Sequence, residues 1–276
     1  MKLVSLKLED GSIRSGVLEG EHISLLQATG GDDALHFIAS GSAQPEMSGE
    51  QIAAADARLL APLLHPPRVF GIGLNYAEHA TESNMKVQDV PTVFLKLPSS
   101  ITGPDSDVLL PPEATQPDYE AELAVVIGKG GYRIHAADWE KHVFGYTILN
   151  DVSARGVQLA TSQWTLGKSF ATFTPMGPWI VTRDEIADPH DLDIKLTLAG
   201  EVMQASNTRH LIFRIPQLIA YLSSILTLEP GDIISTGTPP GVGLGRTPQR
   251  WLNPDEDMVI EIEKIGILRN RTRTVA

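Results

Sequence analysis

Three acidic residues at alternate positions, Asp118, Glu120 and Glu122, are the clearest chemical feature of the chain. Successive side chains of a β-strand point to opposite faces, so a strand here places all three carboxylates on one face. Residues 123–127 follow directly and are apolar at every position, which is typical of a strand covered on both faces. The sequence therefore predicts three acids at the head of a buried strand.

These carboxylates, held close together and partly out of water, must be protonated, paired with bases or neutralised by a cation. Residues 117–128 contain no Lys or Arg. Carboxylate oxygens suit a hard divalent cation, Mg²⁺ or Mn²⁺, which keeps water ligands that a substrate can displace. An acidic strand end open to solvent is the alternative, and this segment alone does not decide between the two.

Two further polar residues adjoin apolar runs. Asp151 follows the run 143–150, where the tip of a strand can offer a carboxylate to a shared cavity as a third metal ligand. An Asp at a strand end is also an ordinary turn residue. Lys168 lies between residues 164–167 and 169–170, an apolar surrounding that would hold its ammonium in place, and a solvated lysine is the alternative.

His79 and Glu82 are three residues apart in a segment, 76–83, that we expect to be helical. At this spacing the carboxylate can orient and polarise the imidazole, which would make His79 a general base. Such pairs are also common on protein surfaces. The glycine-rich segment 236–243 suits a loop that presents backbone amides and hydroxyls to an anion, and a plain structural turn fits its composition equally well.

Several nucleotide-binding and hydrolase motifs are incomplete or missing. Residues 71–76 begin like a dinucleotide-binding loop but lack the third glycine at the required spacing. Residues 167–169 match the end of a phosphate-binding loop, but Ser162 occupies the position of the leading glycine. The chain has no Gly-x-Ser-x-Gly elbow and no His-Glu-x-x-His zinc motif. We therefore reject a Rossmann-type site and a nucleotidase.

The composition, 276 residues with 42% hydrophobic and 20% charged, is that of a globular protein with a substantial core. No apolar run approaches membrane-spanning length, and the N-terminus alternates like a strand rather than a secretory signal. A net charge of -12 disfavours nonspecific nucleic-acid binding. The absence of cysteine excludes disulfides and thiolate chemistry, and it fits a cytoplasmic location.

The elements that position these residues fall into two parts. Three short strands and then two helices are expected near the N-terminus, at residues 2–8, 12–18, 22–25, 32–40 and 48–57. Prolines in segment 61–67 deny a helix, so we place a boundary near residue 65. This gives a small N-terminal antiparallel β/α domain, residues 1–65, and a catalytic domain, residues 66–276.

The second part is expected to be mainly β. Its β-like runs are residues 68–74, 92–97, 121–128, 143–149, 178–182, 192–199, 231–236 and 257–263. One helix begins at Pro216 and continues until a Glu-Pro-Gly sequence at residue 229 ends it. Its apolar face is expected to be core and comprises Leu218, Ile219, Leu222, Ile225 and Leu226. The predicted fold class is α+β, mainly β.

Taken together, five sequence segments resemble the fumarylacetoacetate hydrolase family, in the form with a short N-terminal unit and a C-terminal catalytic mixed β-roll. The segments are Gly73-Leu74-Asn75-Tyr76-Ala77-Glu78-His79, Asp118-Tyr119-Glu120-Ala121-Glu122-Leu123, Asn150-Asp151-Val152-Ser153-Ala154-Arg155, Gly167-Lys168-Ser169-Phe170, and Pro230-Gly231-Asp232 running on to Thr236-Gly237-Thr238-Pro239. Their order is kept over residues 66–270, which is more specific than any one motif.

The resemblance implies roles for particular residues. The metal ligands, for Mg²⁺ or Mn²⁺, would be Glu120, Glu122 and Asp151. His79 and Glu82 would form a water-activating dyad on a lid helix. The residues implied to touch substrate are Lys168, Arg155, Gln158 and Thr238. Ala171 occupies a position where many members carry Asp, so the substrate of a relative should not be copied to this chain.

The implied activity is hydrolysis of a carbon-carbon bond in a 2,4-dioxo acid, an acylpyruvate or a diketo-deoxy sugar acid, through a metal-stabilised pyruvate enolate. Decarboxylation of an oxaloacetate-type acid and isomerisation of a 2-hydroxy-diene-dioate need the same enolate and are alternatives. A noncatalytic 2-oxo acid binder is disfavoured because all implied ligands and both dyad members are present. The family suggests a homodimer that acts on a small molecule, with neither nucleic acid nor membrane as partner.

Overall fold

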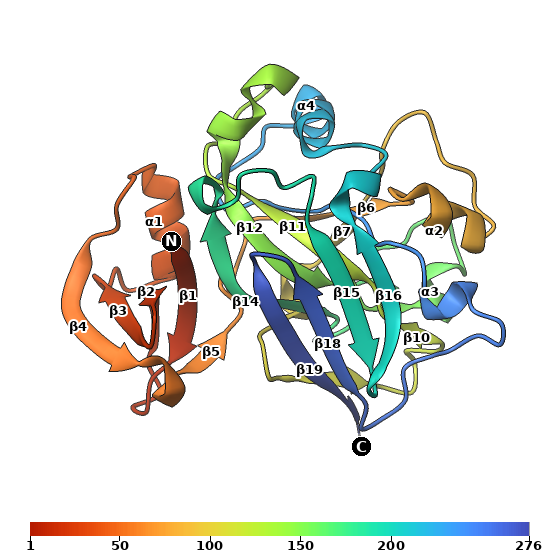
Figure 1. Ribbon diagram of the computed structural model, residues 1–276, viewed down its shortest axis with the longest axis horizontal. Helices are drawn as coiled ribbons and strands as arrows, with labels where there is room; N and C mark the ends of the chain where they lie inside the picture. Colours follow the sequence, from red (N-terminus) through yellow and green to blue (C-terminus); the bar gives the residue numbers. More distant parts are fainter. Residues whose placement is uncertain (276) are drawn as a thin grey trace.

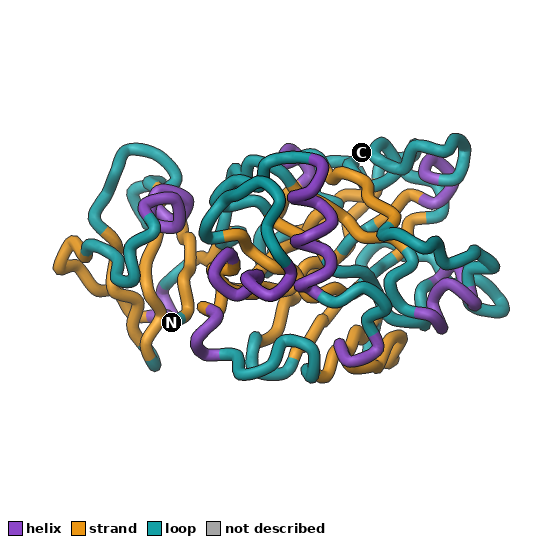
Figure 2. Tube along the Cα trace, turned by 90° about the horizontal axis from the view of Figure 1, so that it is seen from above, coloured by secondary structure: helices purple, strands orange, loops and turns teal. Residues whose placement is uncertain are grey.

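A computed structural model describes residues 1–275. It shows a smaller lobe, built from the N-terminal residues at the red end of the colour scale, beside a larger mixed β-structure (Figure 1). Seen from above, the small lobe lies at one end of an elongated molecule (Figure 2). The predicted fold class, α+β and mainly β, is confirmed.

A single large sheet runs through both lobes. Within the described residues its strand order is β4 (Met47–Ala53), β3 (His22–Leu26), β2 (Ile13–Glu19), β1 (Lys2–Lys7), β14 (Thr174–Thr182), β12 (Val143–Asn150), β11 (Ala121–Ile127), β17 (Ile233–Ser235), β6 (Val69–Gly73) and β7 (Thr92–Lys96). Two short strands branch from it, β5 (Arg58–Leu60) beside β1 and β8 (Ile101–Thr102) beside β14. Most neighbours pair antiparallel, but β17 pairs parallel with β6 and β8 pairs parallel with β14.

A second sheet packs against this one. Its order is β16 (Glu201–Asn207), β15 (Asp193–Leu198), β18 (Asp257–Ile262), β19 (Gly266–Thr274) and β9 (Asp107–Leu110). A separate pair joins β10 (Pro117–Asp118) to β13 (Ser153–Ala154). The α-helices are α1 (Asp33–Ser40), α2 (Ala77–Glu82), α3 (Arg155–Gln158) and α4 (Ile215–Ile225). Six 3-10 turns are described: η1 (Ala54–Asp56), η2 (Pro98–Ser100), η3 (Ala136–His142), η4 (Arg183–Glu185), η5 (Thr208–His210) and η6 (Gly243–Gly245).

Strand β11 is covered on both faces, as its uninterrupted apolar sequence predicted. Its odd-numbered residues, Leu123, Val125 and Ile127, join the main core, which includes side chains of β15, β18 and β19. Ala124 and Val126 face a second core, to which the N-terminal residues also contribute. The strand therefore lies between two hydrophobic layers, and the acids at its head are fixed from both sides.

The N-terminal lobe is joined to the rest of the chain by backbone pairing. Lys2 pairs with Val181 and Leu3 with Ile180, so β1 continues the large sheet through β14. The N-terminal ammonium also donates to Thr182 Oγ1 at 2.6 Å. The two lobes consequently share a sheet and a hydrophobic core, and residues 1–65 as an independent domain stay a prediction.

Two predictions are wrong, one of secondary structure and one of burial. Residues 48–57 were expected to be helical, but they form most of β4 followed by the short turn η1. There β4 pairs with β3, so sheet pairing overrides the local helical pattern. Ile225, expected in the core, is 65% exposed because α4 ends at this residue. No helix within residues 1–275 has both the length and the apolar character needed to cross a membrane.

Candidate active site

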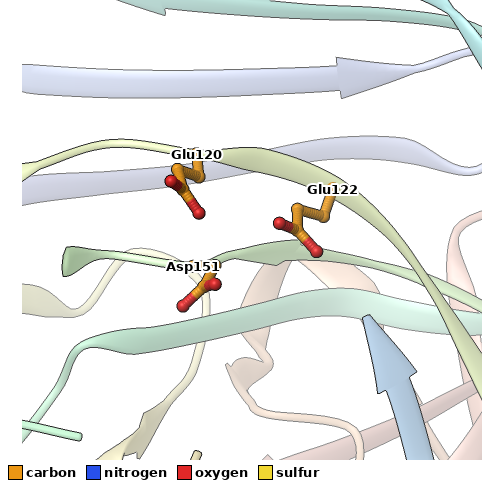
Figure 3. A group of neighbouring side chains, drawn as sticks. All are labelled: Glu120, Glu122 and Asp151. Atoms are coloured by element: carbon orange, nitrogen blue, oxygen red, sulfur yellow. The ribbon is translucent and has the colours of Figure 1, made fainter. Parts of the chain in front are cut away.

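Three acids meet where the ladder between two neighbouring strands is interrupted. Asp118 pairs with Ser153 and Ala121 pairs with Asn150, and neither Glu120 nor Asp151 belongs to a strand. The backbone N–H of Asp151 donates to the Glu120 carbonyl at 2.9 Å, which holds the two segments side by side. Oxygens of Glu120, Glu122 and Asp151 lie within 4.8 Å of one another, and Figure 3 shows the three carboxyl groups gathered together.

Two basic residues pair with this group of acids. Lys168 Nζ donates to Glu120 Oε2 at 2.7 Å and to Asp151 Oδ2 at 2.6 Å. Arg155 donates to Glu120 Oε1 at 2.5 Å, and its Nε donates to Asp118 Oδ2 at 2.9 Å. All five side chains are buried. Asp118 is therefore the partner of an arginine and stands outside the group that could hold a metal.

A third base, Lys96, was not singled out by the sequence. It lies at the end of β7, and its fully buried Nζ donates to Asp151 Oδ1 at 2.6 Å. The same Nζ also donates to the carbonyls of Val152 and Lys168. Burial lowers the pKa of Lys96, and Asp151 only partly offsets this effect. One carboxylate and two carbonyls therefore surround this Nζ.

Glu122 is the acid of the group without a basic partner among the described residues. Its Oε2 accepts from Ser235 Oγ at 2.6 Å and from the Gly237 amide at 2.8 Å. Burial raises its pKa well above 4.5, and the charges of Asp151 and Glu120 raise it further. Burial alone would also raise the pKa of Glu120, but Arg155 and Lys168 outweigh burial and hold it well below its ordinary value.

This donor set fits a hard divalent cation. The three carboxylates offer only oxygen, they lie at the ends of neighbouring strands, and Glu122 has no basic partner among the described residues. The raised pKa of Glu122 has a simple physical meaning, since a bound cation would replace the proton that this buried carboxyl otherwise favours. Glu120, Glu122 and Asp151 are thus the residues that would hold the ion.

The predicted dyad lies across a small cavity from the acids. Helix α2 carries it, and His79 Nδ1 lies 2.9 Å from Glu82 Oε1. Glu82 also accepts from the Gly241 amide, at 2.9 Å to Oε2, which fixes the carboxylate from the opposite side. His79 is buried and lines the same cavity as Glu120 and Glu122. The ring nitrogen that does not face Glu82 is Nε2, the atom available to a water or a substrate.

The cavity is about 20 Å³ in volume, and the residues predicted to touch substrate line it: Arg155, Gln158, Lys168 and Thr238. Gln158 Oε1 accepts from Arg155 at 2.9 Å, while Thr238 Oγ1 bonds to Gln204 and to the Ala121 carbonyl. Ala171, the departure from the family pattern, is exposed and does not line this cavity. The other lining residues are mainly apolar.

The loop 236–243 binds anions, and these are carboxylates of the protein itself. Its amides donate to three acids: Gly237 to Glu122, Gly241 to Glu82 and Gly243 to Asp118. Gly237 has φ +103°, a conformation that favours glycine. A Cβ on Gly243 would lie 1.9 Å from the Arg250 carbonyl oxygen, so no other residue fits there. One loop therefore positions both the acids and the His79–Glu82 pair.

Comparison with known proteins identifies the family of the chain. Residues 68–273 match the model described as fumarylacetoacetate (FAA) hydrolase, C-terminal, and residues 1–62 match an N-terminal model described as Rv2993c-like. The chain belongs to the fumarylacetoacetate hydrolase family. The resemblance inferred from the five sequence segments is thereby confirmed.

Relatives in this family are named for different reactions. The chain is 42% identical over 275 residues to the rat protein named oxaloacetate tautomerase Fahd2a, mitochondrial, covering 92% of this chain and 88% of that protein. It is 41% identical over 266 residues to 2,4-didehydro-3-deoxy-L-rhamnonate hydrolase of Sphingomonas sp. (strain SKA58), covering 95% and 89%. A solved structure named 5-carboxymethyl-2-hydroxymuconate delta-isomerase, from Mycobacterium smegmatis, is 33% identical with a TM-score of 0.85 and full coverage of both chains.

Proposed function

We propose that this protein is a metal-dependent hydrolase that cleaves the C3–C4 bond of a 2,4-dioxo acid, an acylpyruvate or a diketo-deoxy sugar acid. One observation carries the proposal: a His79–Glu82 dyad and a buried group of three carboxylates line or border one small cavity. Hydrolysis needs both a base for water and a means of stabilising an enolate. The proposed site supplies the first on a helix and the second on a sheet.

The ion, Mg²⁺ or Mn²⁺, would be held by Glu120, Glu122 and Asp151 and would supply positive charge to the carboxylate and 2-oxo group of the substrate. Lys168 adds a cation beside the same acids. Burial lowers the pKa of Lys168, but Asp151 and Glu120 outweigh burial, so its pKa is raised and it stays protonated. Lys168 is thus suited to stabilise negative charge that develops on the substrate oxygens.

His79 would take a proton from one water, whose oxygen then forms a bond to C4 of the substrate. The C3–C4 bond breaks, and its electron pair passes into the three-carbon fragment as the enolate of pyruvate. Protonation of that fragment at C3 gives pyruvate, and the other fragment leaves as a carboxylic acid. Glu82 holds the imidazole in position at 2.9 Å and stabilises its protonated form.

Keto–enol tautomerisation of an oxaloacetate-type acid is the second candidate. One observation favours it: the rat protein named oxaloacetate tautomerase is 42% identical to this chain, and the match covers 88% of that protein. Tautomerisation moves a proton between C3 and the oxygen on C2, so it uses the base and the enolate-stabilising charges without attack by water. Decarboxylation of the same acid needs only the charges, and isomerisation of a dienedioate again needs the base.

A direct test offers several substrates to the purified protein with Mg²⁺. The panel contains acetylpyruvate, a diketo-deoxy sugar acid, oxaloacetate and the enol form of oxaloacetate. We expect pyruvate and acetate in equal amounts from acetylpyruvate, measured by coupled lactate dehydrogenase and by NMR. Ketonisation of enol-oxaloacetate, followed by its ultraviolet absorbance, without cleavage of any dioxo acid would overturn the hydrolase proposal and support the second candidate.

A further inference from the structure

The hydroxyl of Ser83 is a buried polar group without a hydrogen-bond partner in the described part of the chain. Ser83 caps the C-terminus of α2, directly after Glu82, and its backbone N–H donates to the His79 carbonyl. Its side chain lines the cavity that the dyad and the acids share. Leaving a buried hydroxyl unpaired is unfavourable, so the geometry favours a partner that enters the cavity.

The wall around Ser83 is apolar. Met85 follows it on the lid, and Trp164, Phe94 and Leu244 complete this side of the cavity. The rings of Phe94 and Trp164 have centroids 5.5 Å apart, so they form one continuous surface. Lys168 Nζ lies 4.9 Å from the centroid of the Phe94 ring, so this wall adjoins the charged part of the site. A group bound against the wall itself meets hydrocarbon and one hydroxyl, which suits an uncharged tail that carries an oxygen.

The wall around Ser83 offers no free partner to a charged tail. None of Met85, Trp164, Phe94 and Leu244 carries a charge. Lys168 is the cation beside this wall, and its ammonium already donates to Glu120 and Asp151. A second carboxylate placed against the wall would be buried without a cation of its own, and such burial is costly.

No side chain on the Ser83 side of the cavity supplies a further cation, among the residues the structure describes. The two cations that do line the cavity are both bound to acids of the protein, Arg155 to Asp118 and Glu120 and Lys168 to Glu120 and Asp151. The cavity is therefore matched to one substrate carboxylate rather than two.

We propose that Ser83 and the apolar wall around it form a subsite for an uncharged substrate tail with a hydroxyl or carbonyl oxygen. This inference rests on the proposed function, because it concerns the group attached to C4 of a 2,4-dioxo acid. It narrows the substrate class to hydroxylated or short neutral acylpyruvates and places dicarboxylates below them. Oxaloacetate, which carries a second carboxylate, is accordingly expected to be a poor substrate.

Three substrates that differ only in the tail test the subsite. They are 2,4-dioxopentanoate, its 5-hydroxy derivative and 2,4-dioxohexanedioate, which carry a methyl, a hydroxymethyl and a carboxymethyl tail. We expect kcat/KM to favour the hydroxylated over the methyl substrate by about fivefold, the effect of one hydrogen bond. The dicarboxylate is expected to be at least about tenfold poorer than the methyl substrate.

Substitution of Ser83 tests whether its hydroxyl forms a hydrogen bond with the substrate tail. In Ser83→Ala the preference for the hydroxylated substrate should fall from about fivefold towards one. Thr81→Val is the matched control, since it removes a hydroxyl from the same helix that donates to the Ala77 carbonyl at 2.9 Å and does not line the cavity. A purely structural role would lower kcat/KM for both substrates equally, and an unchanged ratio in Ser83→Ala would overturn the assignment.

A charge introduced on the wall tests the remainder of the proposal. Met85→Lys should raise the relative kcat/KM for the dicarboxylate by about tenfold or more, whereas Met85→Gln, similar in length but uncharged, should not. Preference of the wild-type protein for the dicarboxylate, with the other two substrates still cleaved, would overturn this inference and leave the proposed function intact. Turnover of none of the three would overturn both.

Discussion

The two sides of the cavity are built in opposite ways. On the acid side, Glu120, Glu122 and Asp151 sit in or beside the strands of a sheet, and each is bound by bases, hydroxyls or amides. On the lid side, His79 and Ser83 belong to a helix of six residues and its cap. This helix begins without a side-chain cap, and one of the two hydroxyls it presents, that of Ser83, has no partner within residues 1–275.

The difference matches what each side must do. Charges stabilise an enolate best when they are already fixed, because moving them into place during the reaction would cost free energy. The lid has a different task, since a cavity of about 20 Å³ holds about one water molecule and cannot admit a dioxo acid. We expect residues 76–90 to move when substrate enters, and mobility of this segment as a lid stays a prediction.

The largest expected effect is on the acid side. Glu122→Gln removes one oxygen charge from the group but keeps an acceptor for Ser235 and for the Gly237 amide. We expect Mg²⁺ affinity to fall by about 100-fold or more. Loss of a residue that only contacts a metal ligand already costs about 10- to 100-fold, so loss of a ligand should cost at least as much. Isothermal calorimetry of the purified protein measures this directly, and chelation should abolish cleavage in the wild type.

The control for this variant is a partly buried acid with no place among the proposed ligands. Glu256→Gln alters a carboxylate that is held by Arg250 and the Asn253 amide, away from the cavity. It should bind Mg²⁺ as tightly as the wild type does. Wild-type affinity in Glu122→Gln would show that Glu122 is not a ligand and would remove the basis for the metal proposal.

The next effect is on the lid side. His79→Ala removes the proposed base, and hydrolysis of acetylpyruvate should fall by about 100-fold or more, the usual contribution of a positioned base. Mg²⁺ affinity should be unchanged, because His79 makes no bond to any of the three acids in the described structure. Rates at saturating Mg²⁺ and calorimetry on the same preparation separate the two effects.

The same variant distinguishes the candidate reactions. Decarboxylation of oxaloacetate needs no base, so it should suffer less than hydrolysis if the protein catalyses it at all. Equal losses in both reactions would contradict the division of roles between the two sides. Unchanged hydrolysis would remove His79 from the mechanism altogether.

The sequence predicted the two sides of the cavity to different extents. The apolar run of β11 and the alternating acids before it indicated the acid side, because burial on both faces leaves a strong pattern. The dyad was found because three-residue spacing on a helix has a clear physical meaning. The five sequence segments of the family then assigned the remaining residues, which local patterns alone left open.

The sequence pattern did not indicate Lys96, and the reason is physical. On β7 the apolar Val93 and Leu95 are substantially exposed, whereas Lys96 is buried on the same face as Phe94. The usual rule, apolar inside and charged outside, is reversed in this strand, because its inner face meets an acid rather than hydrocarbon. The alternation of Phe94 and Lys96 was the available signal.

Long-range pairing accounts for the other failures. Residues 48–57 carry a helical pattern but become an edge strand because β3 offers a partner. The anions bound by the glycine-rich loop turned out to be Glu122, Glu82 and Asp118, which lie far from the loop in sequence. Neither fact can be read from a local window, since each depends on which distant segment the fold brings near.

The smallest expected effect concerns the stability of the metal-free protein, and it has opposite signs at two glutamates. Burial, and then Asp151 and Glu120, raise the pKa of Glu122 in the folded state above its ordinary value of 4.5. A raised carboxyl pKa contributes stability that is fully present below about 4.5 and is lost as pH rises through the folded-state pKa. Glu122→Gln has no such titration, so it should be the more stable protein at neutral pH.

Glu256 supplies the opposite case. Burial raises the pKa of Glu256, but hydrogen bonds from Arg250 and Asn253 outweigh burial and lower it below 4.5. Its contribution is therefore present above about 4.5 and is lost as pH falls through the folded-state pKa, so Glu256→Gln should be the less stable protein at neutral pH. For a domain of this size 1 kcal/mol corresponds to roughly 2–4 °C in Tm, so shifts of a few degrees are expected. Thermal unfolding in chelator from pH 4 to 8 checks both signs, and addition of Mg²⁺ should raise Tm for the wild type and Glu256→Gln but not for Glu122→Gln, because only the first two retain the three acids that would bind the ion.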